Sequence, residues 1–217
     1  MIEVIGDRGK RRRYDPDLAE KINREFKEGK IKGAMKNSPN AAPAANASVD
    51  DICKGYEEFM KNENSSPYHP KNVAARFNAT KEQILEFSKR LIQYKDLEEF
   101  LVHTAVYLTD LMHASQEEGF TIDLTELSKE GFRLWNIGYK LKNKKLTVYG
   151  SVGQGFGNQT EDSIIMVKGD AGNFVGVDAK NSEIYVKGNI VGLSDRIGKG
   201  TRVCKEKGLN WVKVYPQ

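Results

Sequence analysis

Side chains able to perform acid–base or nucleophilic chemistry are scattered along this sequence. His103 and His113 are ten residues apart, whereas two metal ligands on one helix face stand about three or four apart. The acids Glu161, Asp162 and Asp195 have no partner at a spacing typical of an acid–base pair. We therefore expect no catalytic residue, no metal ligand and no cofactor-binding residue, and we expect the chain not to be catalytic by itself.

The two cysteines, Cys53 and Cys204, stand far apart in the sequence. A disulfide framework, a cysteine-based zinc site and an iron–sulfur cluster all need cysteines at repeated spacings, so this chain alone provides none of them. Cys204 precedes the lysine-rich stretch KEK, a setting that can lower a thiol pKa. Because no histidine stands near it in the sequence, we interpret Cys204 as an ordinary strand residue.

A glycine-rich stretch, GSVGQGFG at Gly150–Gly157, is compatible with two structures. A dinucleotide-binding loop needs G-x-G-x-x-G between a strand and a helix, because the helix N-terminus attracts the phosphates. Here Thr160 replaces the third glycine, and the strand-like segment SIIMVKG follows. Glu161 and Asp162 would also repel a phosphate. The stretch is better explained as one corner of a repeating structure.

Glycines of the C-terminal half recur with a 19-residue period. Such a period is typical of a solenoid, in which each unit buries its apolar face only by stacking on its neighbours. Glycine suits the corners of such coils, because it accepts positive φ and lets the next backbone pass close by. The expected columns are Gly131, Gly150, Gly169 and Gly188, then Gly138, Gly157 and Gly176, and finally Gly153 and Gly172.

Apolar side chains repeat in register with these glycines and indicate short strands. We predict the fold class α+β, in which a helical N-terminal region with an extended arm is followed by a short right-handed parallel β-helix. The β-helix should have about four to five coils with a 19-residue period and apolar ladders inside. The expected ladder residues are Leu127, Leu146, Ile165 and Ile184, together with Val148, Val167 and Val186.

Two stretches of these repeats, LTVYGSVGQGFGNQTEDSIIMVKG and GDAGNFVGVDAKNSEIYVKGNIVG, resemble the GXGXG-repeat β-helix. That family includes the C-terminal domain of the glutamate synthase large subunit and the β-helical subunit of formylmethanofuran dehydrogenase. The resemblance implies a structural scaffold beside catalytic domains or subunits, and it transfers no catalytic residue to this chain. The sequence departs from the pattern after Gly188, where Val191 and Asp195 replace expected glycines.

The N-terminal half divides into two further regions. Residues 1–47 read as an arm with one short helix and a linker rich in small residues, and residues 48–119 read as a helical domain ahead of the β-helix domain at 120–217. Capping pairs predict three helix starts within 48–119, followed by a stop at Gly119. The pairs are Ser48 with Asp51, Thr80 with Gln83, and Asp96 with Glu99.

Both ends of a short β-helix expose apolar ladders and unpaired strand groups, so each end needs a cover. We expect the helical domain to cover the N-terminal end. At the C-terminal end, Trp211 and Tyr215 either close the stack or bind a partner. The basic cluster with Arg8, Arg11, Arg12 and Arg13 offers another possible partner-binding site, for a protein surface or for nucleic acid.

Composition favours a protein without strong polyanion binding, because 34 Lys and Arg stand against 30 Asp and Glu, a net charge of +4. The sequence contains no apolar run of about 20 residues and no signal-peptide pattern at MIEVIGDRGKRRR, so we expect a cytoplasmic protein. Our hypothesis is a non-catalytic scaffold or accessory subunit of a larger redox enzyme assembly, with protein partners or self-association. The alternatives are an oxidoreductase related to glutamate synthase and a nucleic-acid-binding protein using the basic arm.

Overall fold

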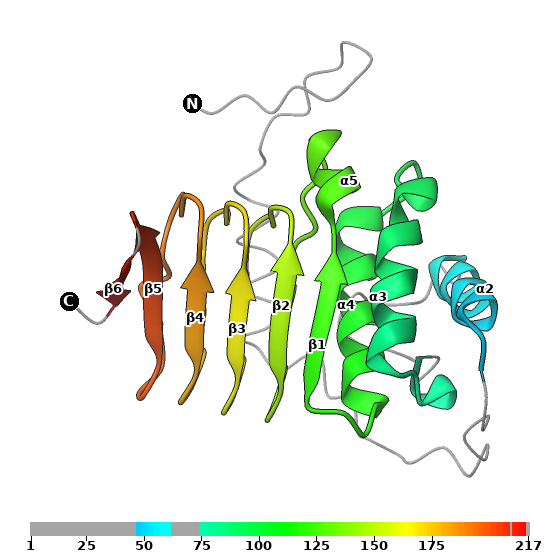
Figure 1. The fold of residues 1–217 in the computed structure, drawn as a ribbon, viewed down its shortest axis with the longest axis horizontal. Helices are drawn as coiled ribbons and strands as arrows, with labels where there is room; N and C mark the ends of the chain where they lie inside the picture. The colour runs from blue at the N-terminus through cyan, green and yellow to red at the C-terminus, as the bar shows by residue number, and fades with distance from the viewer. Residues whose placement is uncertain (1–46, 62–73, 209, 216–217) are drawn as a thin grey trace. The chain divides into compact units, whose positions relative to one another are not determined.

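The computed structural model describes residues 47–61, 74–208 and 210–215. Its helices precede a single sheet of six strands, with one further short helix between the first two strands (Figure 1). The predicted arm at 1–47, apart from its last residue, lies outside the described residues together with Arg8, Arg11, Arg12 and Arg13. The elements are α2 (Val49–Met60), η1 (Ala74–Phe77), α3 (Lys81–Arg90), η2 (Leu91–Tyr94), α4 (Phe100–Ala114), β1 (Gly119–Asp123), α5 (Thr125–Lys129), β2 (Lys145–Tyr149), β3 (Ile164–Val167), β4 (Glu183–Val186), β5 (Arg202–Lys207) and β6 (Asn210–Tyr215).

Two of the three predicted helix starts are confirmed. Ser48 accepts a hydrogen bond from the N–H of Asp51, whose carboxylate accepts one from the N–H of Ser48, and Thr80 with Gln83 forms the same reciprocal box. Each box satisfies two of the backbone N–H groups that a helix start leaves unpaired. These local side-chain contacts fix where α2 and α3 begin.

The third helix begins later than predicted. α4 starts at Phe100, after Glu99 in the left-handed region with φ 56°, and no side chain caps it. Leu97, which directly follows the predicted start at Asp96, is exposed, because residues 91–98 form η2 and tight turns instead of a continuous helix. The predicted stop was also wrong, because α4 ends at Ala114 and Gly119 is the first residue of β1.

Five parallel strands, β1 to β5, stack in chain order, and β6 adds to β5 in the antiparallel direction. From β2 to β5 each residue pairs with the residue 19 positions later, as in Lys145 with Ile164 and Ile164 with Glu183. The strands therefore build a β-solenoid, as predicted. It has about three such turns, fewer than the four to five coils expected.

The coil count falls short because the segment before β2 is not a regular turn. β1 and β2 pair with a longer offset than the later strands, as in Gly119 with Lys145, and α5 stands within this longer connection. The backbone of Leu124 therefore stacks against Gly150. Our prediction that Gly131 is the first residue of this glycine column was wrong. Phe120 likewise takes the ladder position that we assigned to Leu127.

Inside the coils, apolar side chains form two continuous ladders. Each strand turns alternate residues inward, and every ladder residue named below is almost fully buried. The same buried cluster continues into the helices, so helices and coils share one core. One ladder is Phe120, Leu146, Ile165, Ile184 and Val203, and the other is Ile122, Val148, Val167 and Val186.

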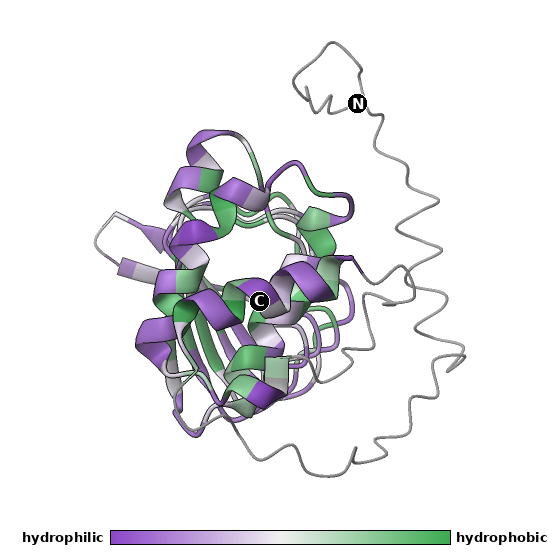
Figure 2. Ribbon diagram, turned by 90° about the vertical axis from the view of Figure 1, so that its right-hand side faces the viewer, coloured by the Kyte–Doolittle hydropathy of each residue, from purple (hydrophilic) through white to green (hydrophobic). Residues whose placement is uncertain are grey.

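The helices cover the β1 end of the solenoid, as we expected (Figures 1 and 2). α3 packs against β1, where the Asp123 N–H donates a 2.8 Å hydrogen bond to the Ser88 hydroxyl. α4 is joined to the first coil by a 2.8 Å bond from the Trp135 N–H to the Leu101 carbonyl. These bonds satisfy polar groups at the start of the stack, which therefore ends against protein rather than water.

Close backbone stacking explains the first glycine column. A Cβ on Gly169 would lie 2.5 Å from the Gly150 carbonyl oxygen, and one on Gly188 would lie 2.7 Å from the Gly169 carbonyl carbon. A Cβ on Gly172 would similarly lie 2.8 Å from the Gly153 carbonyl carbon. Because real Cβ atoms do not approach backbone so closely, any side chain at these corners would push the coils apart.

We expect Gly169→Ala to lower the free energy of unfolding by about 3 kcal/mol or more, because the Gly150 backbone cannot move without separating two coils. Gly119→Ala is the matched control, because a Cβ there meets no atom within 4 Å. It should change stability by less than about 1 kcal/mol. Urea denaturation of both variants measures the difference, and equal effects would show that the coils do not stack this closely.

Candidate interaction surface at the end of the sheet

Residues that could perform acid–base chemistry lie apart in the structure. His103 packs edge-on against Phe59, and burial lowers the pKa values of both His103 and His113. Glu161 pairs with Lys142 at 3.1 Å on the edge of a coil. Within the described residues, no three His, Cys, Asp or Glu side chains come together in a group that could hold a metal ion.

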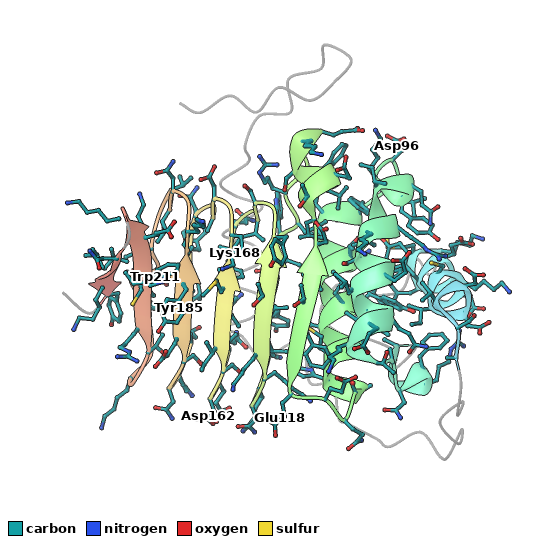
Figure 3. All side chains as sticks on the ribbon, viewed as in Figure 1. Asp96, Glu118, Asp162, Lys168, Tyr185 and Trp211 are labelled. Atoms are coloured by element: carbon teal, nitrogen blue, oxygen red, sulfur yellow. The ribbon has the colours of Figure 1, made fainter. Side chains whose placement is uncertain are left out.

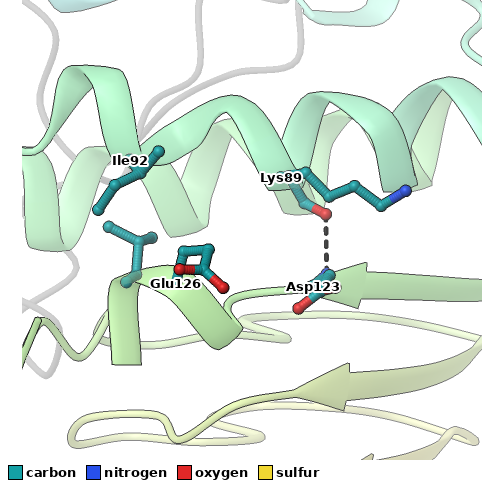
Figure 4. Close-up of a pocket in the computed structure, with 6 residues that line it drawn as sticks. Lys89, Ile92, Asp123 and Glu126 are labelled. Carbon is teal, nitrogen blue, oxygen red and sulfur yellow. Dashed lines mark hydrogen bonds between the residues drawn. The ribbon is translucent and has the colours of Figure 1, made fainter. Parts of the chain in front are cut away.

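A small hollow lies where α3 meets α5 (Figure 4). Its volume is about 30 Å³, the space of one water molecule. It is too small for an organic substrate. The residues lining it are Ser88, Lys89, Ile92, Asp123, Glu126 and Leu127.

Outward-facing side chains of the sheet form a partly apolar surface that we call the outer patch (Figure 3). Strand alternation produces it, because the residues between the buried ladder positions point to the opposite side of the sheet. Tyr149 is 45% exposed and Ile164 is 41% exposed. The outer patch consists of Tyr149, Ile164, Met166, Tyr185 and Trp211.

Trp211 joins the outer patch rather than plugging the core. Its ring meets the ring of Tyr185 edge-on at a centroid distance of 5.1 Å, and 39% of its surface remains exposed. Tyr215 instead covers part of the solenoid end, where its hydroxyl donates to the Ile197 carbonyl at 3.2 Å and its side chain packs on the core. The two residues that we considered together therefore have different surroundings.

The Tyr185 side chain is held in place by polar contacts. Its hydroxyl donates a 2.6 Å hydrogen bond to the Glu183 carboxylate, which also pairs closely with Arg202. The bond to Glu183 stabilises the neutral phenol and, with burial, raises the pKa of Tyr185 to about 12. The hydrogen bond from Tyr185, followed by the one from Arg202, lowers the pKa of the Glu183 carboxyl. Tyr185 therefore presents a fixed, uncharged ring to solvent.

A basic residue at an inward ladder position marks the end of the apolar stack. Lys205 pairs with Val186 and so continues the valine ladder with a basic residue. Its ammonium group donates a 3.0 Å bond to the Asn189 side chain. A charge at an inward position discourages another apolar coil from stacking here, because it would be buried without a counter-ion.

β6 ends the sheet with an edge that no described element pairs or covers. Its inner edge bonds to β5, and it is the last strand in the sheet order, whereas the opposite end strand, β1, packs against α3. Val212 of β6 is 43% exposed. The backbone donors and acceptors along the outer edge of β6 are therefore available to another strand.

Comparison of the chain with protein families, curated proteins and solved structures found no match in any of the three. The resemblance to GXGXG-repeat β-helices thus stays a prediction. In the described part of the chain, no helix combines the length and apolar character needed to cross a bilayer.

Of the outer patch, we predicted only Trp211 from the sequence, and Tyr215, the other aromatic residue that we named, lies on the solenoid end. We missed Tyr149, Ile164, Met166 and Tyr185. Their signal was present as large side chains at the positions between the ladder residues. The predicted glycines Gly138, Gly157 and Gly176 lie at left-handed corners with φ between 71° and 79°, and Gly153 and Gly172 lie where successive coils approach.

A partly buried carboxyl on α4, Asp110, stands apart from the interaction surface. Burial raises its pKa from an ordinary 3.8 to about 7. Because the folded state binds this proton more tightly, Asp110 favours folding fully below about pH 4, and this contribution is lost as the pH rises through 7. Above pH 7 the folded protein contains a poorly hydrated carboxylate.

We expect Asp110→Asn to stabilise the protein at pH 8.5 by up to about 4 kcal/mol, and to change stability little at pH 4, because the amide carries no charge at either pH. Asp96→Asn, at an exposed position, is the control and should have little effect at both values. Urea denaturation at the two pH values gives the comparison. If the increase in the free energy of unfolding caused by Asp110→Asn is no larger at pH 8.5 than at pH 4, the pKa of Asp110 is not raised in the folded protein.

Proposed function

We propose that this chain is a non-catalytic scaffold or accessory subunit that binds a protein partner through the outer patch and the adjoining end of the sheet. The observation that carries the proposal is the difference between the two ends of the solenoid. Helices cover β1, whereas none of the described elements pairs with or covers the outer edge of β6 beside Trp211. A solenoid whose last described strand keeps an unpaired backbone edge is suited to join a neighbouring protein there.

The chemistry of the outer patch supports a protein partner. Tyr and Trp are enriched among residues that dominate binding energy, because they bury a large area with few rotatable bonds. Tyr185 is already fixed by Glu183, and its ring is in contact with Trp211. A partner therefore meets side chains that lose little conformational freedom on binding.

The GXGXG resemblance suggests what kind of assembly this scaffold joins. It implies a right-handed β-helix standing beside catalytic domains or subunits of a redox enzyme. The glycine column at Gly150, Gly169 and Gly188 is consistent with that resemblance. Under this proposal the catalytic centre belongs to the partner, and this chain positions it.

Affinity purification from cells that express the protein at native levels tests the proposal. Wild-type protein should co-purify with a stoichiometric partner. Tyr185→Ala combined with Trp211→Ala should reduce recovery of that partner at least about 30-fold, the effect of losing a binding hot spot. Val191→Ala, which alters an exposed apolar residue outside the strands, serves as the control and should retain the partner.

The proposal fails if the wild-type protein runs alone under native conditions. It also fails if the double variant, shown to be folded by circular dichroism, retains its partner as well as the Val191→Ala control does.

A further inference from the structure

We infer that the outer edge of β6, which no strand in the described part of the chain pairs, captures an extended acidic segment of the partner protein, which adds to the sheet as a further strand. This inference rests on the proposed function and specifies how the partner is held. Strand addition supplies affinity through main-chain hydrogen bonds, while side chains alternating on the two faces supply selectivity.

Position in the sheet makes β6 the receptive strand. The sheet has two end strands, and the one at its start packs against α3. β6 is six residues long, which is enough for a regular ladder, and its first four residues, Asn210, Trp211, Val212 and Lys213, are exposed. Because β6 is already ordered by its pairing with β5, an added strand does not lose free energy by ordering β6 on binding.

The positive charge around β6 favours an acidic partner segment. Residues 199–213 contain five basic side chains and a single acidic one, Glu206, giving a net charge of +4. Arg202 pairs with Glu183, and Glu206 lies 3.9 Å from Lys187. Three lysines of this stretch form neither an ion pair nor a side-chain hydrogen bond with any described residue, unlike Lys205, which bonds to Asn189, and they remain available to carboxylates of a partner. They are Lys199, Lys207 and Lys213.

The same charge disfavours a second copy of this chain. Two β6 edges brought together would place both basic C-terminal stretches side by side, and like charges at strand spacing destabilise the pair. A nucleic acid would satisfy the lysines, but its backbone has no alternating N–H and C=O groups to match a strand edge. An acidic polypeptide fits both the charge and the hydrogen-bond pattern.

Side chains on β6 indicate which residues should alternate with the acids. Trp211 lies on the outer face beside Tyr185, and the adjacent Val212 points to the other face and is also exposed. An added strand would run past both faces, so apolar residues at alternate positions gain contact with Trp211 or Val212. The expected segment therefore alternates acidic and apolar side chains.

A synthetic peptide of about seven alternating Glu and Val residues, blocked at both ends, is the probe. Its binding to the full chain is followed by tryptophan fluorescence and titration calorimetry. We expect a Kd of about 1 mM or tighter. A Lys/Val peptide of the same length should bind at least about tenfold more weakly, because it meets the basic stretch with like charge.

Two controls separate strand pairing from simple charge attraction. The Glu/Val peptide N-methylated at alternate residues keeps every charge but loses the donors of one edge, so its binding should fall at least about tenfold. Lys213→Glu should weaken the unmodified peptide by a similar factor. Lys54→Glu, at an exposed position of α2 and with the same change of net charge, should not weaken binding.

The inference is overturned if the Glu/Val peptide does not bind at millimolar concentration, or if the N-methylated peptide binds equally well. It is also overturned if wild-type protein dimerises through β6. The same holds if Lys213→Glu weakens the binding of an oligonucleotide but leaves the binding of the Glu/Val peptide unchanged. A partner that co-purifies and depends on Trp211, combined with a peptide that fails, would leave the proposed function standing and remove only the strand-addition step.

Discussion

Close approach of successive backbones at the glycine corners is the constraint on which the rest of the structure depends. Gly150, Gly169 and Gly188 stack so tightly that a Cβ has no room, and this contact keeps the strands between them at one fixed repeat spacing. Regular spacing brings like residues into line. Apolar residues then form ladders inside, and the alternate residues form the outer patch, so the fold and the candidate surface have one cause.

The two ends of the stack differ because different chain segments meet them. α3 packs against β1 and supplies polar partners such as Ser88, whereas the last parallel strand carries the inward Lys205 and is followed by a returning antiparallel strand. Lys205 limits further apolar stacking, and β6 still offers a backbone edge. Under the proposed function, this combination would favour a specific charged partner over indiscriminate association.

Local signals in the sequence predicted much of this fold, and the errors have physical reasons. Ser48 and Thr80 marked helix starts correctly because their capping contacts lie within a few residues. Gly131 precedes Gly150 by one repeat length only by coincidence, since α5 lengthens the connection between β1 and β2. Spacing alone cannot reveal such an insertion. We did not predict the outer patch, including Tyr185, because the sequence does not show which outward-facing side chains are covered by other elements and which stay exposed.

Distances between backbone protons, measured by nuclear Overhauser effects in solution, test the central claim most directly. Stacked coils predict contacts between residues one repeat apart from β2 to β5, such as Ile165 with Ile184, and between Phe120 and Leu146 across the longer first connection. Contacts typical of antiparallel hairpins between β2, β3 and β4, or contacts that stack Gly131 on Gly150, would contradict the account.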